Sequence, residues 1–82
     1  MQVSSESYVS ERVKDLLAAV CDVPVAEIRD EGELVSYGLD SVRGMEFILQ
    51  LEEAFAIEVS ESEAIQFETV RDAVTYVRDK MS

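Results

Sequence analysis

Apolar residues recur with a helical period along most of the chain. From Ser4 to about Val20 they follow one another at steps of four, three, one and three positions, so they line one side of a helix. Pro24 disfavours helical backbone at Val23, and we therefore expect this first helix to end before that point. The apolar positions on the predicted stripe are Val9, Val13, Leu16, Leu17 and Val20.

The stretch from Ser41 to Phe55 has the strongest helical pattern. Its apolar residues fall on one broad side of a helix, and its polar residues form a ridge opposite. We therefore predict a second helix whose apolar side faces the core. The apolar positions are Val42, Met45, Ile48, Leu49, Leu51 and Phe55, and the polar ridge is Arg43, Glu46, Gln50 and Glu53.

A capping pattern marks the next helix. Ser60 is followed three positions later by Glu63, which is the spacing of a capping box. In such a box the two residues each satisfy a backbone N–H of the other. The pattern predicts a short third helix through Ala64 and Ile65.

Thr69 and Asp72 repeat this spacing and predict the start of a last helix. The segment "VTYV" within it is rich in residues that favour strands, but the apolar positions keep a helical period, which we give more weight. These positions are Val70, Ala73, Val74, Val77 and Met81.

A long connection joins the first two helices, from about Asp22 to Asp40. Its apolar residues can pin it to a core, and Gly32 and Gly38 supply turns. Connections of this length in small domains are usually functional when they are ordered. The expected anchors are Val25, Ile28, Leu34 and Val35.

Together these segments predict an all-α fold, a small bundle of three main helices and one short helix. With 82 residues, the chain is expected to form one domain over residues 1–82. The predicted core consists of Val13, Leu16, Leu17, Ile28, Leu34, Met45, Ile48, Leu49, Phe55, Val70, Val74 and Val77.

Composition narrows the classes of function. Eighteen Asp and Glu against seven Lys and Arg give a net charge of −11, which repels nucleic acids and anionic lipid surfaces. No apolar run is long enough to span a membrane and no secretory signal is recognisable, so we expect a cytoplasmic protein. With no histidine and one cysteine, Cys21, neither a metal site nor an internal disulfide is expected. Cys21 is expected to pack as a small apolar residue.

Ser41 is the candidate for chemistry, because it stands where the long connection meets the second helix. A hydrolytic serine needs a base, usually histidine, and "GLDSVRG" lacks the glycine spacing of a nucleophile elbow, so a catalytic role is disfavoured. Neighbouring carboxylates are more consistent with solvated faces than with a catalytic pair, and no calcium-loop pattern is present. Two interpretations remain open: Ser41 or Asp40 caps the helix, or Ser41 is a site of modification.

Several segments, in order, resemble the acyl carrier protein family from Val9 to Val77. They are "GLDS", an amphipathic helix ending "LEEAF", then "IEVSESEA" and "FETVRDAVTYV". The resemblance implies that Ser41 receives a covalent 4′-phosphopantetheine arm from a phosphopantetheinyl transferase. It also implies a carrier without catalytic residues of its own, which holds acyl groups as thioesters for a fatty-acid-like or polyketide system. The Met1 start and short tail favour a free-standing chain, and we expect it to be a monomer.

The resemblance also implies that partner enzymes with basic patches dock on the acidic second helix. We expect these to include an acyl- or aminoacyl-loading ligase and synthase, transferase or modifying enzymes. Glu52 is expected to turn toward the third helix, while Arg43 and Gly44 depart from the family pattern and suggest a specialised set of partners. The predicted recognition residues are Leu39, Asp40, Val42, Arg43, Met45, Glu46 and Glu53.

Two alternatives stay open at this point. One is an aminoacyl or peptidyl carrier loaded by an adenylating enzyme, although Asp40 before Ser41 favours acyl carriers, because peptidyl carriers more often have histidine there. The other is an unmodified acidic helical module whose resemblance is structural only.

Overall fold

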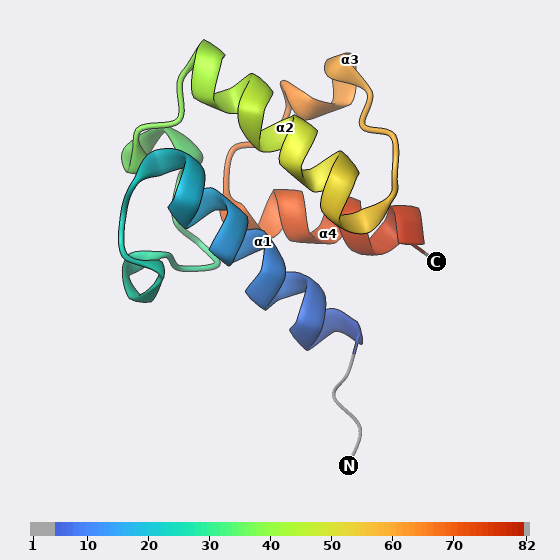
Figure 1. The fold of residues 1–82 in the computed structure, drawn as a ribbon, viewed down its shortest axis with the longest axis horizontal. Coiled ribbons are helices and arrows are strands. Elements are labelled where there is room, and N and C mark those ends of the chain that lie inside the picture. Colours follow the sequence, from blue (N-terminus) through green and yellow to red (C-terminus); the bar gives the residue numbers. More distant parts are fainter. Residues whose placement is uncertain (1–4, 82) are drawn as a thin grey trace.

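The computed structural model describes residues 5–81, and within this range every regular element is helical, so the predicted fold class is confirmed (Figure 1). The predicted start of the first helix at Ser4 lies outside the described residues. None of these helices is long and apolar enough to cross a membrane. The elements are α1 (Ser5–Cys21), the 3₁₀ turns η1 (Val25–Glu27) and η2 (Leu34–Tyr37), α2 (Ser41–Phe55), α3 (Glu61–Ala64) and α4 (Val70–Met81).

Helix α1 packs against both α4 and α2 (Figure 1). The three long helices enclose one apolar core. Each contributes one stripe of its surface, as expected for amphipathic helices. Tyr8 adds an edge-to-face contact with Phe55, with ring centroids 6.3 Å apart. The buried residues are Val9, Val13, Leu16, Leu17, Cys21, Ile28, Leu34, Phe47, Leu51, Phe55, Val70, Ala73, Val74 and Val77.

The side of α2 that faces the core differs from the prediction. Met45 and Leu49, predicted to be buried, are 66% and 58% exposed, whereas Phe47 and Leu51 are buried. Ile48 is half-buried. At about 100° per residue, Phe47, Leu51 and Phe55 form one apolar stripe, and Met45 and Leu49 belong to a second stripe on the roughly opposite side of the helix. Periodicity detects both stripes but cannot tell which of them meets the rest of the protein.

The caps of α2 and α4 explain where these helices begin. Helix α2 spans the predicted residues, and the Asp40 carboxylate accepts a hydrogen bond from the Arg43 backbone N–H at 2.8 Å. At α4, the Asp72 N–H donates to the Thr69 hydroxyl at 3.2 Å, and the Thr69 N–H donates to the Asp72 carboxylate at 3.0 Å. The capping box predicted for the last helix is therefore confirmed.

The capping box predicted for α3 does not form as expected. The Ser60 side chain accepts no capping hydrogen bond and instead pairs with the Ser62 hydroxyl at 2.9 Å. The Tyr76 hydroxyl, from α4, stands between the two box residues: the Ser60 N–H donates to it at 3.3 Å, and it donates to the Glu63 carboxylate at 3.0 Å. The helix also ends at Ala64, with Ile65 as its C-cap.

The connection between α1 and α2 is ordered, but only part of the predicted anchoring holds. Ile28 and Leu34 are buried, as predicted, whereas Val25 and Val35 are 47% and 71% exposed. A 3₁₀ turn has three residues per turn, so one buried residue in it leaves its neighbours facing outward. Val35 is such a neighbour of the buried Leu34.

Backbone and charged contacts hold the connection where the two valines do not. The Leu34 N–H donates to the Glu68 carbonyl at 2.8 Å, and the Arg71 N–H donates to the Asp30 carbonyl at 2.9 Å. The Lys14 ammonium lies 2.7 Å from the Asp30 carboxylate. This hydrogen bond holds the pKa of Asp30 below its usual value. The connection is thus joined to both α1 and the start of α4.

Two glycines shape the last part of this connection. The Tyr37 hydroxyl accepts a hydrogen bond from the Arg29 N–H at 2.9 Å and occupies the space that a Cβ at Gly32 would need. Gly38 ends η2 with φ of 98°, a left-handed conformation that favours glycine. The chain then reaches Ser41 three residues later.

Candidate functional site

Ser41 is the first residue of α2, and its side chain is exposed. Because Asp40 acts as the N-cap, the helix does not need the Ser41 hydroxyl for capping. Within residues 5–81 that hydroxyl makes no hydrogen bond. Of the two interpretations of this junction, capping belongs to Asp40, and the serine hydroxyl is left open to solvent.

The position suits a covalently attached phosphate ester. The first N–H groups of a helix lack partners within the helix, and the helix dipole favours negative charge at this end. An exposed hydroxyl at the first position can be reached by a modifying enzyme, and a phosphodiester on it would lie next to these N–H groups. The residues present therefore fit a phosphopantetheine group.

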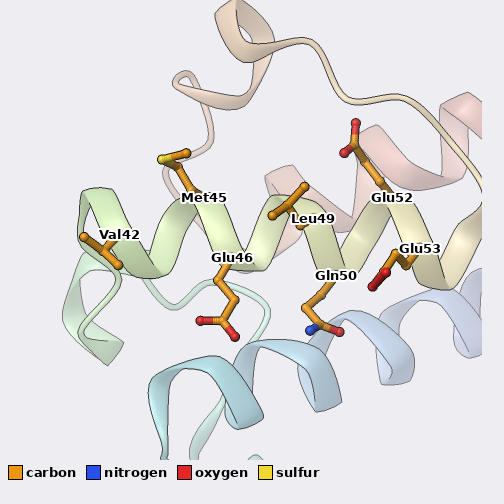
Figure 2. A pocket seen from close by; sticks show the side chains of 7 residues that line it. All are labelled: Val42, Met45, Glu46, Leu49, Gln50, Glu52 and Glu53. Atoms are coloured by element: carbon orange, nitrogen blue, oxygen red, sulfur yellow. The ribbon is translucent and has the colours of Figure 1, made fainter.

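An open hollow of about 680 Å³ runs along the outer side of α2 (Figure 2). Its apolar part comes from the second stripe of the helix, and carboxylates stand at its edges. Four of the predicted recognition residues meet here, together with three that were not predicted. The lining residues are Val42, Met45, Glu46, Leu49, Gln50, Glu52 and Glu53.

Leu49 was missed as a surface residue because its helical spacing assigned it to the core. At 58% exposure it continues the apolar strip formed by Val42 and Met45. Such a strip of exposed apolar side chains bordered by charges is typical of a protein interaction surface. The signal in the sequence was the excess of apolar residues in α2 over what one core-facing stripe can use.

Three predicted recognition residues lie outside the hollow. Leu39 is half-buried and packs against the core, and Asp40 is committed to the cap of α2. Arg43 is exposed, and its guanidinium lies toward Gly38, 3.2 Å from where a Cβ on that glycine would stand. The positive charge of Arg43 therefore lies next to the connection between α1 and α2.

Glu52 turns toward the segment before α3, as predicted. Its carboxylate accepts a hydrogen bond from the Val59 N–H at 2.9 Å and is half-buried. In Figure 2 it points to the opposite side of α2 from Glu46 and Gln50. Glu46 and Glu53 are the exposed carboxylates at the edge of the hollow.

Cys21 packs in the core as predicted, since it is only 4% exposed. Burial raises the pKa of its thiol, with the positive charge of Arg43 acting against this and the negative charge of Asp40 adding to it. A buried thiol with a raised pKa is a poor nucleophile at neutral pH. Within residues 5–81 no group of carboxylates and thiol is placed to hold a metal ion.

Solved structures of carrier domains share this fold. The HMG-ACPI domain from the CurA module of Lyngbya majuscula, solved by NMR, superposes with a TM-score of 0.84 and 20% identity, covering 99% of this chain and 85% of that one. The mupirocin didomain ACP gives a TM-score of 0.79 and 18% identity, covering 98% of this chain and 43% of that one. The fold is thus that of an acyl carrier domain.

Sequence comparisons identify the family. A family model described as "Phosphopantetheine attachment site" matches residues 11–77. The acyl carrier protein of Solidesulfovibrio magneticus is 33% identical over 73 residues, covering 88% of this chain and 94% of that protein. This chain therefore belongs to the acyl carrier protein family. It is a carrier domain whose cofactor is covalently attached 4′-phosphopantetheine.

A much longer relative is also similar. The non-reducing polyketide synthase dbaI of Emericella nidulans is 36% identical over 77 residues, covering 94% of this chain. The chain spans only 3% of that synthase's length. Similarity therefore extends both to a protein of about this size and to one segment of a very large enzyme.

Proposed function

We propose that Ser41 carries the 4′-phosphopantetheine arm and that the chain presents acyl intermediates on it. The observation that carries the proposal is an exposed, unbonded hydroxyl at the first position of α2, with Asp40 supplying the cap. Ser41 also lies within the segment matched by the family model. Attached there, the arm supplies the thiol on which acyl groups travel as thioesters.

The attachment reaction requires little of this chain beyond its geometry. The Ser41 oxygen attacks the β-phosphorus of coenzyme A, so an oxygen–phosphorus bond forms, the pyrophosphate bond breaks, and adenosine 3′,5′-bisphosphate leaves. The chain has no histidine, so the serine proton passes to a base of the transferase. The role of α2 is to hold the hydroxyl in place at its exposed end.

The carrier function itself is tethering. An arm fixed to a small domain keeps its cargo at a raised effective concentration for enzymes that dock on that domain, while those enzymes supply the catalysis. Similarity to a polyketide synthase and to an acyl carrier protein supports acyl intermediates of a polyketide or fatty-acid-like system. The expected partners are the transferase, a loading ligase and synthase enzymes, and the expected location is the cytoplasm.

The hollow on α2 is the proposed docking surface for these enzymes. Val42, Met45 and Leu49 offer an apolar strip, and Glu46 and Glu53 offer charge to a basic patch. Exposed ion pairs contribute only about 0–1 kcal/mol each and are screened by salt. Docking should therefore be brief and sensitive to ionic strength, as suits a shuttle that visits several enzymes.

A loading assay tests the attachment site. The purified unmodified protein is incubated with coenzyme A and a broad-specificity phosphopantetheinyl transferase, and its intact mass is measured. Wild-type protein should gain one phosphopantetheine, and Ser41→Ala should gain none. Ser36→Ala, which removes another exposed serine nearby, is the control and should load like wild type. Loading of Ser41→Ala would refute the assignment.

The same assay, followed over time, tests the docking surface. Glu46→Lys should slow loading by up to about fivefold at low salt, the size expected for one exposed charge pair. Glu27→Lys, an equal change of charge on η1, should leave the rate nearly unchanged. Equal slowing by both variants would point to net charge and not to the α2 surface.

The intact mass of protein from its native host would separate acyl from aminoacyl cargo.

A further inference from the structure

Helix α3 is not held in place by burial of its own side chains. It has only four residues, none of them buried, and a helix of this length is not stable alone in water. Ile65, directly after it, is 81% exposed. What keeps α3 formed must therefore come from contacts other than an apolar face.

Tyr76 of α4 supplies such contacts. Its hydroxyl accepts from the Ser60 N–H at 3.3 Å and donates to the Glu63 carboxylate at 3.0 Å, which uses both of its hydrogen-bonding capacities. These two groups are the ones that a capping box joins directly. The Tyr76 hydroxyl thus bridges the two groups and completes the cap of α3. It comes from a helix 13 to 16 residues further along the chain.

Neighbouring contacts fix the tyrosine ring and the residue before Ser60. The Tyr76 ring packs edge-on against Phe67, with centroids 5.2 Å apart, and the Lys80 ammonium lies 5.5 Å from the ring centroid. Directly before Ser60, the Glu52 carboxylate of α2 accepts from the Val59 N–H. The polar contacts to α2 and to α4 therefore meet at the start of α3, and the Phe67 ring holds the segment against Tyr76 at its other end.

We propose that Tyr76 and Glu63 form a latch that controls α3 as a lid. With the latch closed, α3 is capped and the half-buried Ile57 and Phe67 on either side of it stay packed against the core. With the latch open, α3 unfolds as a separate unit while the core of α1, α2 and α4 persists, because the buried side chains lie in those helices and the connection before α2. The lid then exposes the apolar side chains that flank it.

The latch also gives a docking partner a means of opening the lid. Glu63 is exposed, so a basic side chain of a partner can pair with its carboxylate and compete with the Tyr76 hydroxyl. A cation that binds Glu63 better in the open state shifts the population toward that state. This inference does not depend on where the arm is attached.

Amide hydrogen exchange tests the latch. The relevant amides are those of Ala64, Ile65, Gln66 and Phe67, which donate to carbonyls within the segment. Tyr76→Phe keeps the ring and removes the hydroxyl, and should speed their exchange by about fivefold or more, the effect of losing one net hydrogen bond. Glu63→Ala should act in the same way. Exchange in α1 and α2 should not change.

Two control variants make the test specific. Tyr8→Phe removes the hydroxyl of another tyrosine, one that packs on Phe55 and makes no hydrogen bond within residues 5–81, so the exchange rates should match wild type. Ser60→Ala removes the side chain of the N-cap but keeps the backbone N–H that donates to the Tyr76 hydroxyl. It should therefore affect α3 far less than Tyr76→Phe.

Three results would overturn the proposal. The first is unchanged exchange of the four amides in Tyr76→Phe, and the second is a Ser60→Ala effect as large as that of Tyr76→Phe, which an ordinary capping box predicts. The third is equal acceleration in all helices, which would mean that α3 is not a separate unit. Repeating the measurement with Ser41→Ala should give the same pattern, so failure of the attachment site and failure of the latch are distinguishable.

Discussion

Gly44 lies inside α2 although nothing in the fold requires glycine there. A Cβ at this position would meet nothing within 4 Å. Glycine inside a helix costs about 1 kcal/mol relative to alanine. Gly44→Ala should therefore raise the free energy of unfolding by about 1 kcal/mol and the melting temperature by about 4–8 °C.

Gly38→Ala is the control for this thermal unfolding experiment. Gly38 has a φ of 98°, and a Cβ there would stand 3.2 Å from the Arg43 guanidinium, so alanine should lower the melting temperature. A lower melting temperature for Gly44→Ala would instead show that the space beside Gly44 is filled in solution.

Ala56 presents the opposite case at the end of the same helix. It closes α2 in the left-handed conformation, with φ of 54° and ψ of 48°, which costs a residue with a Cβ about 1–2 kcal/mol. Ala56→Gly should stabilise the protein by about 0.5–1 kcal/mol in urea unfolding, after the greater chain entropy of glycine is subtracted. Ala54→Gly, two residues earlier within the helix, should destabilise it. If both variants lost stability, the left-handed cap would be wrong.

At the scale of elements, helix α4 should lose stability in acid through its cap. The N–H groups of Glu68 and Thr69, with the Thr69 hydroxyl, hold the pKa of Asp72 below its ordinary value of about 3.9. A lowered folded-state pKa stabilises the fold above the ordinary value, and this contribution disappears as the pH falls through the folded-state value.

Asp72→Asn should consequently lower the free energy of unfolding by about 1 kcal/mol near neutral pH. The difference from wild type should shrink as the pH falls from about 4 through the lower folded-state pKa, because the unfolded carboxylate takes up a proton first and the folded one only below that pKa. Asp79→Asn, in the last turn of α4 where a negative charge opposes the helix dipole, should cause no such loss. A difference that does not change with pH would contradict a charged cap.

The elements also show how far the sequence alone can lead. The bounds of α2 and the capping box at Thr69 depend on neighbours within four residues, and both were predictable. The choice between the two apolar stripes of α2 depends on α1 and α4, and so was not. The cap of α3 depends on Tyr76, more than ten residues away, which a local capping pattern cannot indicate.

In the candidate site, too, the features that depend on local sequence were predictable and those that depend on distant residues were not. The place of Ser41 at the exposed start of α2 could be predicted from the local pattern, and its role as the attachment residue stays a prediction. The hollow on α2 was predicted in part, since Glu46 and Glu53 were placed on the surface but Leu49 was not. Once a helix carries more apolar residues than its core contact needs, the surplus is a signal for binding that periodicity alone does not reveal.

At the scale of the whole molecule, charge should limit stability. A net charge of −11 on 82 residues produces self-repulsion, which salt screens. The melting temperature should therefore rise between low ionic strength and about 0.15 M salt. Divalent cations should act at lower concentrations. A flat melting temperature across this range would show that the repulsion is already relieved in the folded state.

The central claim is that this acidic bundle carries its arm on Ser41. The most direct test is peptide fragmentation mass spectrometry of protein loaded with coenzyme A by a phosphopantetheinyl transferase. We predict that the added group maps to Ser41, at the first position of α2. A phosphopantetheine group on any other residue, with Ser41 unmodified, would contradict the proposed site.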